Sequence, residues 1–178
     1  VAVLAILILI LPIRRIFNDN VEIKSFKTPY HYMPYRRGNI YYKNPLWWTH
    51  TVYFTLDFIE KNLTKDELFL ALPYEPLYYF LSGKPSPTRQ LVFFDFSAIP
   101  EEQEKTIIKE LEDHKVNWVL LSNRCSSTEA GLGSFGESHS PLLGAYIKKN
   151  FEEVHHYGEW ERPPGWIGNH AVKILKRK

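Results

Sequence analysis

Cysteine is almost absent from this sequence of 178 residues, which contains only Cys125. A single thiol cannot form an intramolecular disulfide, and it excludes every metal site that needs two or more cysteines. No sign of charge dominates either, because 22 basic and 20 acidic residues give a net charge of +2. This balance gives no reason to expect a nucleic-acid partner. The composition implies neither a metal ion nor a cofactor.

Hydrophobic and aromatic residues are abundant, at 44% and 15% of the chain. A chain of this length and composition has enough apolar surface for one globular domain with a sizeable core. We therefore look for one domain and for the segments that lie outside it.

The first eleven residues are all apolar, and they are followed by Pro12, Arg14 and Arg15. As a helix, at about 1.5 Å per residue, they would cover roughly half of the ~30 Å hydrocarbon core of a bilayer. Residues 1–13 therefore predict the end of a transmembrane helix; a buried strand and a signal-peptide core are the alternatives. The positive-inside rule applied to Arg14 and Arg15 favours a cytoplasmic domain, but long domains follow that rule weakly.

Residues 14–45 show no sustained hydrophobic period, and their tyrosines alternate with prolines and with Arg36 and Arg37. We interpret them as an aromatic-rich connecting arm. Amphipathic rings with basic neighbours suit a bilayer interface. A sugar-stacking surface and an arm packed over its own domain would use the same residues.

Residues 46–178 predict one α/β domain, in which apolar runs alternate with amphipathic helices. We expect helices at residues 46–63, 101–114 and 141–150, and strands at 68–72, 91–96 and 116–121. Right-handed crossovers would make these strands a mainly parallel sheet in a three-layer domain. Residues 151–157 and 166–175 predict an antiparallel pair at the C-terminal end.

The unit from Leu68 to Arg89 is the centre of this prediction. Its first strand ends at Pro73, and a short helix begins with Glu75 and Pro76 and closes at Gly83. The inner face of that helix is assigned to its apolar residues, which leaves at least one of its two tyrosines outward. Ligand crevices in open α/β sheets lie at the carboxyl ends of strands.

The candidate contact residues for an acceptor or for a membrane part are therefore Tyr74, Glu75, Tyr78, Tyr79, Lys84 and Arg89. The alternative for Glu75 is that it only caps its helix, where the helix dipole favours a carboxylate. None of these residues is assigned a catalytic role.

Residues 131–136 match G-x-G-x-x-G, the fingerprint of dinucleotide-binding folds. That fingerprint needs its first glycine directly after a strand and a helix directly after the loop. Nearly ten residues separate the glycines from the preceding strand, and the next helix cannot begin before Ser140. We therefore predict that this loop binds no dinucleotide.

The domain resembles the extracytoplasmic C-terminal domain of membrane glycosyltransferases of the GT-C class, the family of dolichyl-phosphate-mannose protein mannosyltransferase-like and aminoarabinose transferase-like enzymes. The resemblance covers roughly residues 46–177 and rests on the segments 58–62 (FIEKN), 68–73 (LFLALP), 75–83 (EPLYYFLSG), 87–89 (PTR), 116–120 (VNWVL) and 146–154 (YIKKNFEEV).

This resemblance implies a parent enzyme that transfers a sugar from a polyprenyl-phosphate donor to a lipid, glycan or protein acceptor outside the cytoplasm. In that family the catalytic acid lies in a loop of the membrane part, so the present chain is expected to be inactive alone. Its partners would be the membrane part of the same polypeptide, the lipid-linked sugar and the acceptor. The alternative is a membrane-tethered domain that binds a glycan or a protein without catalysis.

Overall fold

The computed structural model describes residues 31–35, 38–42, 47–126, 131–162 and 169–178. The predicted end of a transmembrane helix, at residues 1–13, lies outside these ranges. Within them, no helix combines the length and the apolar content needed to cross a bilayer. The arm contains two strands, β1 (His31–Tyr35) and β2 (Gly38–Tyr42), which pair as a two-stranded sheet. The sequence pattern does not predict this pair.

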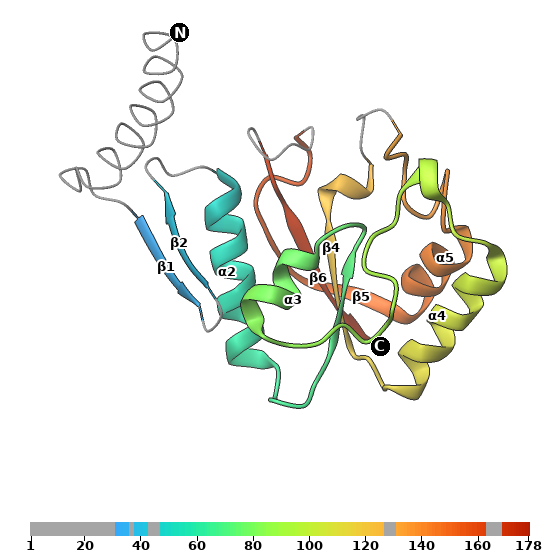
Figure 1. Cartoon of the computed structure of the whole chain (residues 1–178), viewed down its shortest axis with the longest axis horizontal. Coiled ribbons are helices and arrows are strands. Elements are labelled where there is room, and N and C mark those ends of the chain that lie inside the picture. Colours follow the sequence, from blue (N-terminus) through green and yellow to red (C-terminus); the bar gives the residue numbers. More distant parts are fainter. Residues whose placement is uncertain (1–30, 36–37, 43–46, 127–130, 163–168) are drawn as a thin grey trace, which may run out of the picture. The chain divides into compact units, whose positions relative to one another are not determined.

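The main sheet has four strands in the order β3 (Phe69–Leu72), β4 (Trp118–Ser122), β6 (Val172–Arg177), β5 (Phe151–Tyr157). β3 and β4 are parallel, whereas β6 is antiparallel to both of its neighbours. The predicted α/β class and the terminal antiparallel pair are confirmed. The expectation of a mainly parallel sheet is wrong, because this sheet contains one parallel pair and two antiparallel pairs (Figure 1).

Residues 91–96, predicted to be the second parallel strand, do not form a strand. The Phe93 N–H donates to the Pro73 carbonyl (2.9 Å), while the N–H groups of Asp95 and Phe96 donate to the loop at residues 131–132. Phe93 is buried, but Leu91 and Phe96 are exposed. The segment therefore runs across the end of the sheet, and β4 pairs directly with β3.

The helices are α2 (Trp47–Asn62), α3 (Pro76–Ser82), α4 (Glu101–Asp113) and α5 (Pro141–Asn150). The described part of the chain has two hydrophobic clusters that take alternate residues of β3, because successive strand residues point to opposite faces of a sheet. Phe69 and Ala71 pack with side chains of α2 and α3, whereas Leu70 and Leu72 pack with side chains of α4 and α5. Figure 1 shows the two pairs of helices on opposite sides of the sheet.

α4 and α5 are joined by a buried polar contact. Glu104 is 2% exposed, and its Oε2 accepts a hydrogen bond from the Leu143 N–H in the first turn of α5 (2.8 Å). Ser140 occupies the N-cap position of α5, but its hydroxyl makes no capping hydrogen bond. The carboxylate of another helix therefore satisfies a donor that a serine cap would otherwise serve.

Candidate functional site

Three strand ends meet at one edge of the main sheet. Because β3 and β4 are parallel, the residues that follow them, Glu75 and Arg124, leave the sheet on the same side. β6 is antiparallel to β4, with Ser122 opposite Val172, so His170 approaches the same edge from the start of β6. This is the edge at which ligand sites lie in open α/β sheets.

Glu75 lies inside this edge and is 1% exposed. It occupies the N-cap position of α3, but its carboxylate makes no capping hydrogen bond, and neither oxygen accepts a hydrogen bond from the described residues. Burial raises its pKa from 4.5 to about 7, against the opposing effects of the Ser122 hydroxyl and the Arg124 charge. The carboxyl group therefore titrates near neutrality.

His170 is the nearest basic side chain, with Nε2 3.9 Å from Oε2 of Glu75. The same nitrogen lies 3.1 Å from the Tyr78 hydroxyl, in a hydrogen bond whose donor depends on the tautomer. Burial, with a smaller contribution from the Arg124 charge, lowers the pKa of His170 to about 3. The imidazole is therefore neutral at pH 7, and the side chain is 1% exposed.

Arg124 extends the cluster toward the surface. It is 8% exposed, and its guanidinium carbon lies 4.4 Å from the centre of the Tyr74 ring. A cation–π contact of this kind contributes about 2 kcal/mol when it is desolvated. The Tyr74 ring also packs on Phe94 (4.9 Å between centroids), and Phe94 stacks on Phe96 (5.1 Å), which is 71% exposed. A row of aromatic rings thus leads from the buried cluster to solvent.

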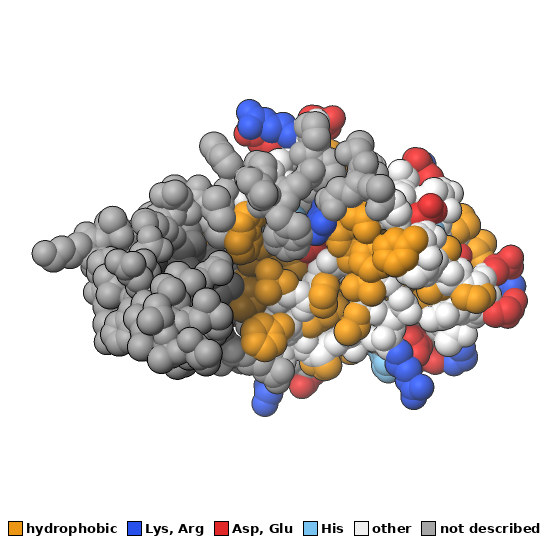
Figure 2. Space-filling model, turned by 45° about the horizontal axis from the view of Figure 1, so that its top comes forward, with side chains coloured by type: hydrophobic (Ala, Val, Ile, Leu, Met, Phe, Trp, Pro, Cys, Tyr) orange, Lys and Arg blue, Asp and Glu red, His pale blue; other side chains and the backbone are white. Residues whose placement is uncertain are grey.

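Hydrophobic side chains form a patch on this edge. Figure 2 turns the top of Figure 1, where β3 and β4 end, toward the viewer and shows this patch in orange. The exposed members of the 91–96 segment, Leu91 and Phe96, contribute apolar surface of this kind.

Two predicted site residues, Tyr78 and Tyr79, are both buried, so the inference that one of them points outward is wrong. The Tyr79 hydroxyl accepts a hydrogen bond from the Ala71 N–H (2.8 Å) on the free side of β3, and burial raises the pKa of Tyr79 to about 12. Tyr78 contacts His170 and Tyr79 contacts the backbone of β3, so the buried face of α3 includes both tyrosines. Phe80, assigned to the inner face from its spacing, is 54% exposed.

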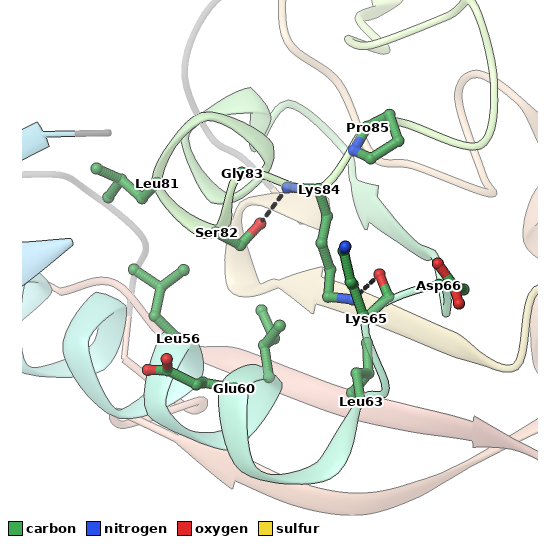
Figure 3. A pocket seen from close by; sticks show the side chains of 11 residues that line it. Leu56, Glu60, Leu63, Lys65, Asp66, Leu81, Ser82, Gly83, Lys84 and Pro85 are labelled. Carbon is green, nitrogen blue, oxygen red and sulfur yellow. Dashed lines mark hydrogen bonds between the residues drawn. The ribbon is translucent and has the colours of Figure 1, made fainter. Parts of the chain in front are cut away.

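Lys84 and Arg89 do not join this cluster. The Lys84 ammonium donates hydrogen bonds to the carbonyls of Thr64 (2.6 Å), Lys65 (3.2 Å) and Glu67 (2.8 Å), which precede β3 and so lie at its other end. Figure 3 shows this side chain beside a cavity of about 540 Å³. Lys84 therefore holds the connection between α2 and β3, while Arg89 is exposed.

The glycine loop has a packing role. Gly131, Gly133 and Gly136 all have positive φ angles, and a Cβ atom on Gly133 would lie 2.4 Å from the Ser138 hydroxyl oxygen and 2.6 Å from Cβ of Asp95. β4 ends at Ser122, nine residues before the first of these glycines. The geometry of the dinucleotide fingerprint is not present, and the absence of nucleotide binding stays a prediction.

Sequence reasoning missed Arg124 and His170. Arg124 follows a strand that was predicted correctly, so the rule that placed Glu75 at the sheet edge also applies to it. His170 gave no such signal, because it lies inside residues 166–175, which were predicted to be a strand. Its role depends on β6 lying next to β4, and local sequence carries no sign of that neighbour.

Comparisons with protein-family models, with curated proteins and with solved structures found no match. Within the described ranges, no three side chains of His, Cys, Asp or Glu are grouped to hold a metal ion.

Proposed function

We propose that this chain is the extracytoplasmic C-terminal domain of a polytopic membrane glycosyltransferase. The parent enzyme would transfer a sugar from a polyprenyl-phosphate donor to a lipid, glycan or protein acceptor, and the catalytic acid would lie in its membrane part. In this proposal residues 1–13 are the end of a transmembrane helix, and residues 14–45 connect that helix to the domain. Residues 46–178 form a three-layer α/β domain on the periplasmic or external face of the membrane.

One observation carries the proposal: three of the six segments of the family resemblance fold as one connected unit. Residues 68–73 form β3 and its end, residues 75–83 form α3 with its caps, and residues 116–120 lead into β4, the strand that pairs with β3. Several residues of the 75–83 segment have a definite structural task. Gly83 closes α3 at a φ of 72°, and Glu75, Tyr78 and Tyr79 are buried.

The contact surface for the membrane part or the acceptor would be the sheet edge that this unit builds. Tyr74, Glu75 and Tyr78 are buried and would support this surface from beneath by packing. Phe96 supports an interface here, because a phenylalanine 71% exposed at the end of a stack of rings adds no core packing. Exposed apolar patches are typical of interaction surfaces.

The second candidate is a membrane-tethered domain that binds a glycan or a protein without catalysis. The same exposed ring, Phe96, favours this reading equally. The two candidates differ in whether the full-length protein transfers a sugar.

The test uses membranes that contain the full-length protein, with labelled polyprenyl-phosphate sugars as donors. We expect transfer by the intact protein, a loss of at least tenfold when residues 46–178 are deleted, and none by the 178-residue chain alone. Transfer without the domain would contradict the proposal, and binding without transfer by the intact protein would favour the second candidate.

A point variant tests the contact surface in the same assay. Phe96→Asp should lower transfer, whereas Val154→Asp, which places the same charge at an exposed apolar position of β5, should not. Equal transfer activity of the two variants would contradict the assignment of the sheet edge as the contact surface.

A further inference from the structure

A second hollow, of about 230 Å³, opens between α2 and the chain that follows β5. His50, Thr51 and Phe54 of α2 line one side, and Tyr157 and Gly158 line the other. Drug-sized ligands occupy sites of about 300–1,000 Å³. The hollow is therefore the size of a ligand with one ring.

One wall of the hollow is aromatic. Phe54 is 47% exposed and stacks on Tyr157 with 5.7 Å between ring centroids and 22° between ring planes. Phe54 is not part of either hydrophobic cluster of the described residues, so the core does not explain an aromatic ring here. The ring offers apolar surface to whatever enters the hollow.

Another wall consists of buried polar groups that the protein holds in place. Asn169 is 7% exposed, and its side-chain amide donates to the carbonyls of Glu159 (2.7 Å) and Arg162 (3.1 Å). These two bonds use the amide hydrogens and fix the position of the side-chain oxygen, which is an acceptor. His170 also lines the hollow and is held by the Tyr78 hydroxyl.

Gly158 brings the backbone close to this polar wall. Its φ is +81°, and a Cβ atom there would lie 2.5 Å from the His170 carbonyl oxygen and 2.9 Å from the Thr51 hydroxyl oxygen. A side chain at this position would disturb the lining of the hollow.

The charges of the lining compensate one another. Glu159 and Arg162 form a salt bridge, and burial lowers the pKa of His170 to about 3, so its ring is neutral at pH 7. Such a wall favours a neutral ligand that has hydroxyl groups on one side and C–H groups on the other. A pyranose ring has this pattern, since its C–H face packs on aromatic rings and its hydroxyls donate and accept hydrogen bonds.

We infer that this hollow is a subsite for a single neutral pyranose, such as one sugar unit of a glycan. The inference deepens the proposed function and rests on it in one respect: the proposed function identifies the acceptor glycan as the source of the bound sugar. Binding of a free sugar is independent of transfer, so the two are tested separately.

The experiment titrates the ¹⁵N-labelled 178-residue chain in detergent micelles with methyl glucopyranoside, methyl mannopyranoside and methyl galactopyranoside. We expect saturable chemical-shift changes with at least one sugar, in the millimolar range and centred on the backbone amides of His50, Gly158 and Asn169. Glucuronate, which has the same ring and a negative charge, should bind more weakly.

Matched variants locate the site. Phe54→Ala should weaken binding at least fivefold, whereas Phe80→Ala, which removes a similarly exposed phenylalanine from α3, should change it less than twofold. The inference is overturned if no sugar binds saturably, if the two variants bind equally well, or if glucuronate binds best.

If the chain binds a sugar but the full-length protein transfers none, the subsite is supported and the proposed function is contradicted. If the full-length protein transfers a sugar but no sugar binds at this hollow, the proposed function is supported and the subsite is contradicted.

Discussion

Replacing Glu75 by glutamine should change how stability depends on pH. The pKa of this carboxyl group is about 7 in the folded protein and 4.5 for an ordinary glutamate. Between these values the folded state binds more protons than the unfolded state, so the free energy of unfolding falls as pH rises. At about 1.4 kcal/mol per pH unit, the loss is about 3 kcal/mol by pH 8. Glutamine resembles the neutral carboxyl and avoids this loss.

His170 acts in the opposite direction. Its pKa is about 3 in the folded protein and 6.5 in an ordinary histidine, so the unfolded state binds more protons between these values and stability rises with pH. The two slopes oppose each other between pH 4.5 and 6.5, which hides the effect of Glu75 in the wild-type curve. The comparison of wild type with Glu75→Gln removes the His170 contribution.

The assay is urea unfolding followed by tryptophan fluorescence at pH 4 to 8. The stability of Glu75→Gln relative to wild type should rise by about 3 kcal/mol between pH 4 and pH 8. Glu152→Gln, at an exposed position of β5, is the control and should differ from wild type by a nearly constant amount. A constant difference for Glu75→Gln, or a fall with increasing pH, would refute the argument.

Three further variants test polar contacts between separate elements by the same unfolding assay. Lys84→Met leaves three backbone carbonyls without their common donor and should cost about 1–3 kcal/mol, whereas exposed Lys65→Met should change stability by less than about 0.5 kcal/mol. Tyr79→Phe removes the acceptor of a buried N–H and should cost about 1–3 kcal/mol; a neutral effect would mean that water replaces the hydroxyl. Glu104→Ala should cost about as much because the Leu143 N–H loses its partner, and unchanged stability would contradict the buried link between α4 and α5.

Local patterns predicted the helices and the outer strands well, because the residues that determine where such an element begins and ends lie close together in the sequence. The 141–150 helix has its predicted bounds, and α3 begins and ends at the expected Pro76 and Gly83. The apolar run at residues 68–72 correctly indicated a strand buried on both faces. Proline, glycine and hydrophobic period are sufficient for such elements.

The errors occurred where distant residues decide the outcome. An apolar run such as residues 91–96 has the composition of a strand, but its hydrogen bonds go to Pro73 and to residues 131–132. The two tyrosines of α3 were divided between inside and outside by hydrophobic period. The structure instead buries Tyr78 against His170, 92 residues away in the chain. Polar aromatic side chains become core residues when such a partner exists, and local sequence does not report it.

The position of β6 in the sheet has a consequence for biosynthesis. β6 is the last strand of the described chain, yet it lies between β4 and β5 and supplies ladder hydrogen bonds to both. While the polypeptide is being made, β3, β4 and β5 emerge first and are left with a gap where β6 will enter. The sheet therefore closes only after Arg177 has been synthesised, and until then the facing edges of β4 and β5 are open to other chains. A product that stops before Val172 lacks a central strand, and for such a product degradation competes directly with assembly.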